Sequence, residues 1–265
     1  MITSLQNQRI KDAITLHNKS RERRIQNKFT IEGLREINLA AANGYDIETL
    51  FVCADLAIAD FHEAKQRIEV SKEVFAKLAL RENSDGFFAI ANTKFLSFNE
   101  IRLSENPFII VAESIEKPGN LGAILRTADA ANVDAVIVCD SLCDIYNPNV
   151  IRSSLGCLFT RQILTCTSQQ CFEFLKSKKI TICAAELKAS QFYHQTDMSQ
   201  ACAVIVGTEA AGLSDFWINN ADVQIKIPMR GVIDSLNVSV SAAIITFEAM
   251  RQRNFKQFAG INILK

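Results

Sequence analysis

The sequence of 265 residues lacks the features that mark membrane and secreted proteins. It contains no apolar run of about 18 residues or more, so we expect no membrane-spanning helix. The first residues have no charged segment followed by an apolar one, so no signal peptide is predicted and a cytoplasmic location follows by default. These absences favour an ordinary globular protein, and the 48% hydrophobic content is enough to form a core.

Metal-binding patterns are also missing. None of the eight cysteines forms a C-x-x-C pair, and most stand in apolar segments such as Ile137-Val138-Cys139. The three histidines, His17, His62 and His194, lie outside every motif described below. We therefore interpret the cysteines as reduced core thiols, in preference to a metal or redox role, and predict no metal site.

Net charge is absent as well, because 29 Lys and Arg residues balance 29 Asp and Glu residues. This argues against a protein that binds nucleic acid through bulk positive charge. The charges are unevenly distributed, however, and residues 9–36 are rich in Lys and Arg. A basic face there would suit phosphate contacts, although a solvated helix without a partner explains it equally well. The candidate RNA-binding residues of this segment are Arg9, Arg21, Arg23 and Arg24.

Apolar periodicity divides the chain into two predicted domains. Residues 1–103 are typical of a small α/β unit, and the polar segment that ends at Pro107 marks the boundary. From residue 107 to residue 265, short apolar strands alternate with helices. Strands without polar alternation are buried on both faces, which predicts a parallel sheet covered by helices. The strands expected in this second domain are 108–112, 135–139, 180–184, 203–207 and 224–227.

Ligands of open α/β sheets bind beyond the carboxyl ends of the strands, and three loops there carry polar residues and turn formers. In the first loop, Asn120 can cap the following helix, and Gly122 allows close approach of the backbone. Arg126 follows Gly122 by about one helical turn, so it can point toward the same open end. The spacing alone favours a simpler alternative, a capped helix with a surface arginine.

The second loop follows a strand directly, as Gly207-Thr208-Glu209 and then Gly212. The glycines permit a sharp turn whose backbone N–H groups are free for a ligand. Glu209 stands where the second glycine of a dinucleotide-binding motif would be, and its carboxylate would repel a pyrophosphate. This pattern favours a cofactor without phosphates and weighs against a nicotinamide-dependent enzyme.

Two further segments have polar residues whose role the spacing leaves open. In the third loop, Ile227-Pro228-Met229 ends a strand, and Ser235-Leu236-Asn237 opens the final helix, where helix capping is an alternative role. In the fourth segment, Arg152, Ser154 and Gly156 could line a substrate cleft. A helix start with a tight turn is an equally good reading of that fourth segment.

Taken together and in this order, the four segments resemble the SpoU-type (TrmH-type) family of RNA 2′-O-ribose methyltransferases of the SPOUT superfamily. The resemblance covers roughly residues 107–255. The family's Asn-x-Gly-x-x-x-Arg motif matches Asn120 to Arg126, and its Gly-x-Glu-x-x-Gly-Leu motif matches Gly207 to Leu213. Its third motif is matched from Ile227 to Ser239, and its Arg-x-Ser-x-Gly pattern from Arg152 to Gly156.

The resemblance implies a fold and an assembly that periodicity cannot show. It implies a C-terminal trefoil knot, a homodimer whose active site is completed across the interface, and a small RNA substrate-binding domain before the methyltransferase domain. It also implies S-adenosylmethionine as the cofactor, held in a bent form by backbone of the knot loops. The cofactor-binding residues carried over are Gly207, Thr208, Glu209, Gly212, Ile227, Met229 and Leu236.

The resemblance also implies the residues that act on the substrate. Arg126 would orient the ribose 2′-hydroxyl and stabilise the charge that develops on it, because a guanidinium normally stays protonated. Asn237 and Ser235 would position the substrate and Arg126, Glu209 would organise the cofactor loop, and Asn120 completes the predicted catalytic group. Arg152 and Ser154 are added to the candidate RNA contacts.

The expected activity is therefore methylation of a ribose 2′-hydroxyl in RNA, with ribosomal RNA as the preferred substrate. Three alternatives remain open at this stage. They are a transfer-RNA methyltransferase, a non-catalytic RNA-binding or ribosome-assembly factor of the same fold, and a nicotinamide-dependent enzyme.

Overall fold

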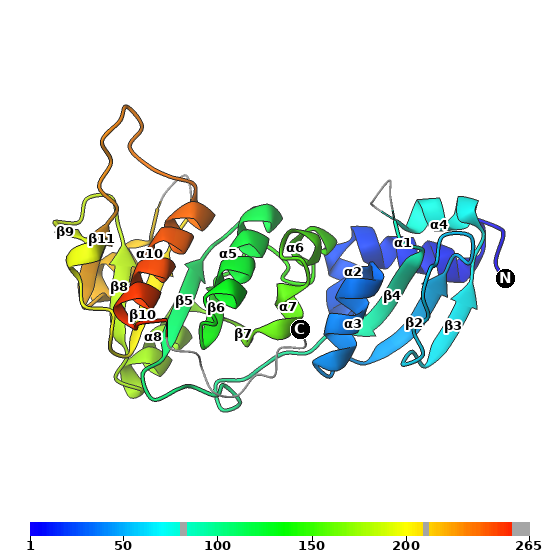
Figure 1. Ribbon diagram of the computed structural model, residues 1–265, viewed down its shortest axis with the longest axis horizontal. Coiled ribbons are helices and arrows are strands. Elements are labelled where there is room, and N and C mark those ends of the chain that lie inside the picture. Colours follow the sequence, from blue (N-terminus) through cyan, green and yellow to red (C-terminus); the bar gives the residue numbers. More distant parts are fainter. Residues whose placement is uncertain (80–83, 209–211, 256–265) are drawn as a thin grey trace. The chain divides into compact units, whose positions relative to one another are not determined.

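The computed structural model describes residues 1–79, 84–208 and 212–255, which form two compact units (Figure 1). The first unit contains residues 1–94 and also the later segment 144–160. The second contains residues 95–143 and the chain from residue 161 onward. None of the helices in the described ranges is long and apolar enough to cross a membrane.

The first unit is built on a four-stranded mixed sheet in the order β1-β4-β2-β3. The strand β4 pairs antiparallel with both of its neighbours, whereas β2 and β3 are parallel. The strands are β1 (Lys28–Glu32), β2 (Ile47–Val52), β3 (Gln66–Glu69) and β4 (Phe87–Asn92). The helices are α1 (Gln8–Asn18), α2 (Ser20–Gln26), α3 (Leu34–Ala42), α4 (Lys72–Leu78), α6 (Pro148–Ser153) and α7 (Cys157–Thr160).

The second unit is built on a seven-stranded sheet in the order β7-β6-β5-β10-β8-β11-β9, and every pair of neighbouring strands in it is parallel. The carboxyl ends of all its strands therefore meet at one edge. The strands are β5 (Phe108–Glu113), β6 (Ala135–Cys139), β7 (Ile163–Cys166), β8 (Thr181–Ala185), β9 (Gln191–Phe192), β10 (Cys202–Val206) and β11 (Val223–Lys226).

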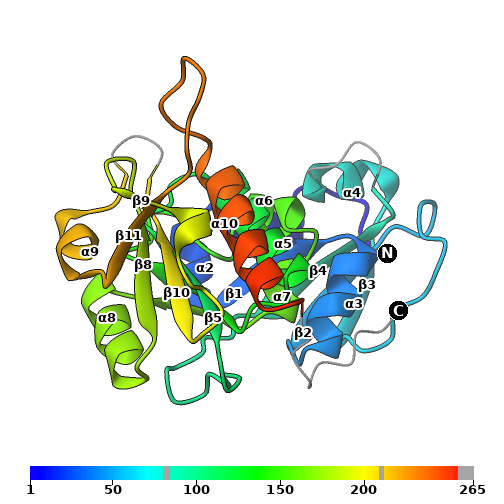
Figure 2. The same cartoon turned by 60° about the vertical axis from the view of Figure 1, so that its left-hand side comes forward.

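Helices cover both faces of this parallel sheet, as the unbroken burial of β5, β6 and β10 requires. They are α5 (Pro118–Ala130), α8 (Ser168–Ser177), α9 (Asp215–Asn220) and α10 (Val238–Gln252), with a 3₁₀ turn at Tyr193–Gln195. Figure 2 shows α10 lying beside α5, in contact with it and with β10. Because β11 lies beyond β8 in the sheet and α10 contacts β10, the chain after β11 returns toward the middle of the sheet to form α10.

The parallel α/β fold predicted for the second domain is confirmed. All five strands expected after residue 107 are present, each within one residue of its predicted ends. The sequence missed β7, a short edge strand with Thr165 exposed, and β9, which has only two residues. In the first unit it missed β3, because three of its four residues are exposed and leave no apolar pattern. The trefoil knot stays a prediction.

The compact units differ from the predicted ranges 1–103 and 107–265 in two respects. The first unit ends at Lys94, before the proline-ended connector, and segment 144–160 packs with it. Within that segment, Tyr146 and Phe159 pack on Phe29 of β1, with ring centroids 4.4 and 5.9 Å away. Periodicity along the chain could not predict that this segment packs with the first unit, because it lies between β6 and β7, two strands of the second unit. Whether the compact units are also the functional domains stays a prediction.

Candidate active site

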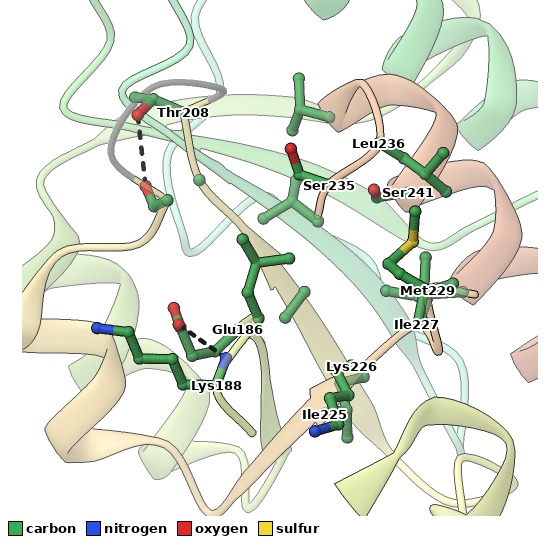
Figure 3. Close-up of a pocket in the computed structure, with 17 residues that line it drawn as sticks. Glu186, Lys188, Thr208, Ile225, Lys226, Ile227, Met229, Ser235, Leu236 and Ser241 are labelled. Carbon is green, nitrogen blue, oxygen red and sulfur yellow. Dashed lines mark hydrogen bonds between the residues drawn. The ribbon is translucent and has the colours of Figure 1, made fainter. Parts of the chain in front are cut away.

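A pocket of about 280 Å³ opens at the carboxyl edge of the parallel sheet, where β8, β10 and β11 end (Figure 3). Its walls come from the loops after these three strands and from the start of α10. Residues far apart in the sequence therefore meet in one place. This is the position at which ligands of open α/β sheets bind.

Most of the predicted cofactor residues line this pocket. They come from two of the loops singled out in the sequence, and Ser235, predicted to act on the substrate, lines it too. Glu209 lies outside the described residues. The cofactor candidates on the pocket wall are Gly207, Thr208, Gly212, Ile227, Met229 and Leu236.

The turn after β10 depends on its two glycines. Thr208 and Gly212 exchange backbone hydrogen bonds of 2.9 and 3.0 Å, so these two residues lie side by side. A Cβ atom on Gly207 would lie 2.1 Å from the carbonyl oxygen of Gly212, so no other residue fits there without moving the backbone. Gly212 has φ of +70°, which L-residues rarely adopt.

A buried carboxylate holds the far end of the same loop. Glu113, the last residue of β5, is 5% exposed. Its two oxygens accept hydrogen bonds from the backbone N–H and the hydroxyl of Ser214, at 2.8 and 2.5 Å. Glu113 thereby fixes the start of α9 and the loop that forms one wall of the pocket. The sequence analysis gave Glu113 no role, although it ends a predicted strand.

The pocket has an apolar side and a charged side. Figure 3 shows Met229 and Leu236 on one side and Glu186 and Lys188 on the other. One carboxylate oxygen of Glu186 accepts a hydrogen bond from the backbone N–H of Lys188, at 3.1 Å. Lys226 also lines the pocket, and its ammonium lies 5.6 Å from the centre of the Phe192 ring.

The sequence analysis missed Glu186, Lys188 and Lys226 because they belong to no motif. The rule that ligands bind at the carboxyl ends of parallel strands could have identified them. Glu186 and Lys188 follow β8 directly, and Lys226 is the last residue of β11.

The first and third motifs meet at the side chains of Asn120 and Asn237. The amide nitrogen of Asn237 donates a hydrogen bond of 3.1 Å to the side-chain oxygen of Asn120. The oxygen of Asn237 accepts from the backbone N–H of Ser239 at 2.9 Å, so Asn237 also caps α10. The helix-capping alternative is therefore correct for Asn237, and the same side chain also bonds to Asn120. Its neighbours Leu236 and Val238 line the pocket, which puts this hydrogen bond at the pocket's rim.

Arg126 is exposed on α5, the helix whose first turn carries Asn120. Among the residues that the structure describes, its guanidinium has no hydrogen-bond or ion-pair partner. It follows Asn120 by about 9 Å along the helix axis, and helical side chains lean back toward the helix N-terminus. Among the described residues no side chain holds the guanidinium in place, and Arg126 does not line the pocket itself.

Two of the candidate RNA contacts are corrected by their burial in the first unit. Arg23 is 3% exposed, and its guanidinium bonds to Asp144 at 2.6 Å and to the carbonyl oxygens of Leu16 and His17. Ser154 is fully buried, and its hydroxyl donates to the carbonyl oxygen of Ile151 at 3.0 Å. Both side chains hold the unit together and are not available to RNA. The candidates that remain exposed are Arg9, Arg21, Arg24 and Arg152.

Two protein families match the chain, one over each part of the sequence. The SpoU rRNA methylase family matches residues 107–247. The MRM3-like substrate binding domain matches residues 7–89. The first match includes every described loop of the pocket, and the second falls within the first compact unit.

Individual proteins of the same kind are similar over nearly the whole chain. A 23S rRNA (guanosine(2553)-2′-O)-methyltransferase of Bacillus subtilis is 29% identical, covering 93% of this chain and 97% of the relative. A solved RNA 2′-O ribose methyltransferase is 38% identical with a TM-score of 0.83, covering 96% of this chain and 99% of the other. An AdoMet-bound rRNA methyltransferase of Sinorhizobium meliloti is 27% identical with a TM-score of 0.86, covering 94% and 97%.

Proposed function

Since the chain belongs to the SpoU rRNA methylase family, we propose that it transfers the methyl group of S-adenosylmethionine to a ribose 2′-hydroxyl of ribosomal RNA. The observation that carries the proposal is the meeting of separated loops in one pocket. The loops after β10 and β11 line that pocket, and the Asn120–Asn237 hydrogen bond ties the first turn of α5 to its rim.

The chemistry of the pocket fits this cofactor. S-adenosylmethionine joins a flat adenine to a sulfonium, an ammonium and a carboxylate. Ile225, Ile227 and Leu236 offer an apolar surface for the ring. The carboxylate of Glu186 suits the cationic groups, and Lys188 or Lys226 suits the carboxylate. No phosphate-binding turn is needed, in agreement with the sequence of the second loop.

The bound cofactor supplies an electrophilic methyl group, and the protein's own residues have to align and activate the hydroxyl. Alignment of two bound reactants contributes up to about 7–11 kcal/mol. Arg126 would donate hydrogen bonds to the 2′-oxygen and stabilise the negative charge that grows on it as the hydroxyl proton passes to solvent. Asn237 and Asn120 hold the ribose at the pocket rim, and Ser235 closes the wall beside it. Glu209, by family resemblance, organises the cofactor loop.

The first unit would bring the RNA to this site through its exposed arginines. A match to a substrate-binding domain supports this division of labour. A homodimer completes the site in this proposal. The apolar side chains left exposed on the loop before α10 and on the helix itself, Val232, Ile233, Val240 and Phe247, support such an interface. The ribosomal substrate implies a cytoplasmic protein.

The direct test is transfer of labelled methyl groups from S-adenosylmethionine to ribosomal and transfer RNA, followed by mapping of 2′-O-methylated positions. We expect one ribosomal position to be modified. No transfer to any RNA would favour a non-catalytic assembly factor, and modification of transfer RNA alone would overturn the substrate. A thermal-shift comparison should show stabilisation by S-adenosylhomocysteine and none by NAD.

The role of Asn237 can be separated from its helix cap. Asn237→Asp keeps an oxygen that caps α10 but loses the N–H group that Asn120 accepts. Asn237→Ala loses both, at a cost of about 1 kcal/mol in stability for the cap. We expect both variants to lose methylation about 10- to 100-fold, and only the alanine variant to unfold earlier in urea. Full activity in Asn237→Asp would reduce Asn237 to a helix cap.

A further inference from the structure

Three cysteines of the second unit come together away from the cofactor pocket. Cys139 is the last residue of β6, Cys166 is the last residue of β7, and Cys171 lies in the first turns of α8. Their Sγ atoms all lie within 4.8 Å of one another, and those of Cys139 and Cys166 are 3.9 Å apart. In the part of the chain that the structure describes, no other group of three Cys, His, Asp or Glu residues is this close.

The fold produces this cluster by register and packing. Cys139 and Cys166 are paired positions in the parallel β6–β7 ladder, so their side chains leave the same face of the sheet. Helix α8 packs on that face and places Cys171 next to the other two cysteines. A capping box of Thr167 and Gln170 fixes the N-terminus of α8. Three thiols from three elements therefore lie next to one another. Packing of an apolar core does not by itself require such a cluster of thiols.

We propose that Cys139, Cys166 and Cys171 bind one thiophilic metal ion. Zinc-to-sulfur bonds are about 2.3 Å, which puts tetrahedral ligand sulfurs about 3.8 Å apart. The observed spacing of 3.9 Å already matches that value, and closing the other pairs needs shifts of less than an ångström. Each thiol loses its proton on binding, and the charge of the ion offsets the thiolates that result.

The surroundings supply an entrance and a nearby acidic side chain. Cys139 and Cys171 are fully buried, whereas Cys166 is partly exposed at the edge strand of the sheet. Asp140 follows Cys139 and is close enough for its charge to act on both Cys166 and Cys171. One of its oxygens accepts from the backbone N–H of Ser168 at 3.1 Å, which holds the carboxylate beside the start of α8. Three thiolates and one water molecule would make a tetrahedral zinc site, and three thiolates alone would suit Cu⁺.

The bound ion would have a structural role. It would join the ends of β6 and β7 to the start of α8, and β7 is an edge strand with a single pairing partner. The single tryptophan of the chain can report on it, because two hydrogen bonds through Ser168 link Trp217 to Asp140, the residue that follows Cys139. Its indole N–H donates to the hydroxyl of Ser168 at 3.0 Å, and the backbone N–H of Ser168 donates to Asp140.

The test uses the full chain, reduced and freed of metal with a chelator, and titrated with Co²⁺. We expect one equivalent per chain to bind, with the visible bands and sulfur-to-metal charge transfer of a tetrahedral cobalt thiolate and quenching of Trp217. Zn²⁺ should displace Co²⁺ and raise the thermal unfolding midpoint. A parallel titration with Cu⁺ shows which of the two ions the site prefers.

Variants decide whether the three cysteines are the ligands. Cys166→Ser, at the partly exposed position, should weaken Co²⁺ binding more than about 100-fold, which exceeds the ~10–100-fold that loss of an outer partner causes. Asp140→Asn, which removes a nearby charge but no ligand, should weaken it about 10- to 100-fold. The matched control Cys183→Ala removes a buried cysteine of the same sheet and should leave binding unchanged.

Three outcomes would overturn the proposal. They are an absence of cobalt–thiolate bands in the wild-type chain, binding that survives in Cys166→Ser, and a disulfide between two of the three cysteines in protein purified without oxidant. Because none of these measurements uses RNA or methyl transfer, failure of the metal site is independent of failure of the proposed function.

Discussion

The two compact units use arginine in opposite ways. In the second unit, Arg126 is exposed on α5, the helix whose first turn carries Asn120, and has no partner among the described residues. In the first unit, Arg23 is buried and bonded to Asp144 and two carbonyl groups. Both stand in segments that the sequence marked as functional. Burial, and not residue type, separates a side chain that can act on a substrate from one that holds the fold.

Sheet topology explains why the two units differ. The parallel strands of the second unit send all their carboxyl ends, and the loops that follow, to one edge of the sheet, where a pocket forms. The mixed sheet of the first unit distributes its strand ends over both edges. The second unit is therefore the one built to collect catalytic groups. The predictions below test this contrast, beginning with the largest expected effect.

Arg126→Ala should reduce methyl transfer by about 10²–10³-fold or more, because a group that stabilises developing charge is lost. Cofactor affinity should stay within a few-fold, and the urea unfolding midpoint should not change, because the side chain is exposed. Arg126→Lys, which keeps the charge but loses the planar fork, should recover only part of the rate. Wild-type turnover in Arg126→Ala would end the assignment of Arg126.

Arg23→Ala should do the reverse and destabilise the first unit by about 3 kcal/mol, because Asp144 and two carbonyl groups lose their partner. The exposed neighbour Arg24 is the matched control, and Arg24→Ala should change stability by less than about 0.5 kcal/mol. Urea unfolding followed by circular dichroism reports both units, whereas fluorescence of Trp217 reports the second alone. Equal stability of the two variants would contradict the structural role of Arg23.

The first unit should also lose stability in acid through His17. Burial, and then the charge of Arg23, lower the pKa of His17 from 6.5 to about 4. The unfolded chain therefore binds a proton that the folded one does not, so stability is full above about pH 6.5 and falls as the pH drops toward 4. At pH 5 the loss is about 2 kcal/mol.

His17→Asn should remove most of that pH dependence. Its amide can still bond to the Thr30 hydroxyl, which lies 2.7 Å from Nδ1 of His17. The measurement is urea unfolding of both proteins at about pH 7.5 and pH 5. If the variant loses as much stability between these two pH values as the wild-type protein, other titrating groups cause the loss.

The smallest expected effect concerns RNA affinity and its dependence on salt. Replacing Arg9, Arg21 and Arg24 with alanine removes up to three phosphate contacts, which should lower the slope of log affinity against log salt by about 2 for single-stranded RNA. Methyl transfer at saturating RNA should persist. The matched control removes the same charge from the second unit at Lys176, Lys178 and Arg251. If the slope changes equally in the two triple variants, the first unit does not contribute more to RNA binding than the second.

Most of the second unit could be predicted from the sequence, because apolar strands that are buried on both faces produce an unmistakable pattern. The pocket loops after β10 and β11 could be predicted too, since turn formers and polar residues follow those strands directly. Segment 144–160 could not, because its partners in the first unit are about a hundred residues away in the chain. The same reason explains the error at Arg23, whose acidic partner Asp144 lies in that segment.

The sequence by itself determined the order of the apolar strands and most helices, and the polar groups of the motifs that follow them, because these depend on local pattern and spacing. Only the tertiary structure decided which distant groups meet. It joined Asn120 to Asn237, set Glu113 against Ser214, and gathered three cysteines that have no metal-binding spacing in the chain. The physical reason is that side-chain contacts follow from strand order and register, which no short segment of a sequence encodes.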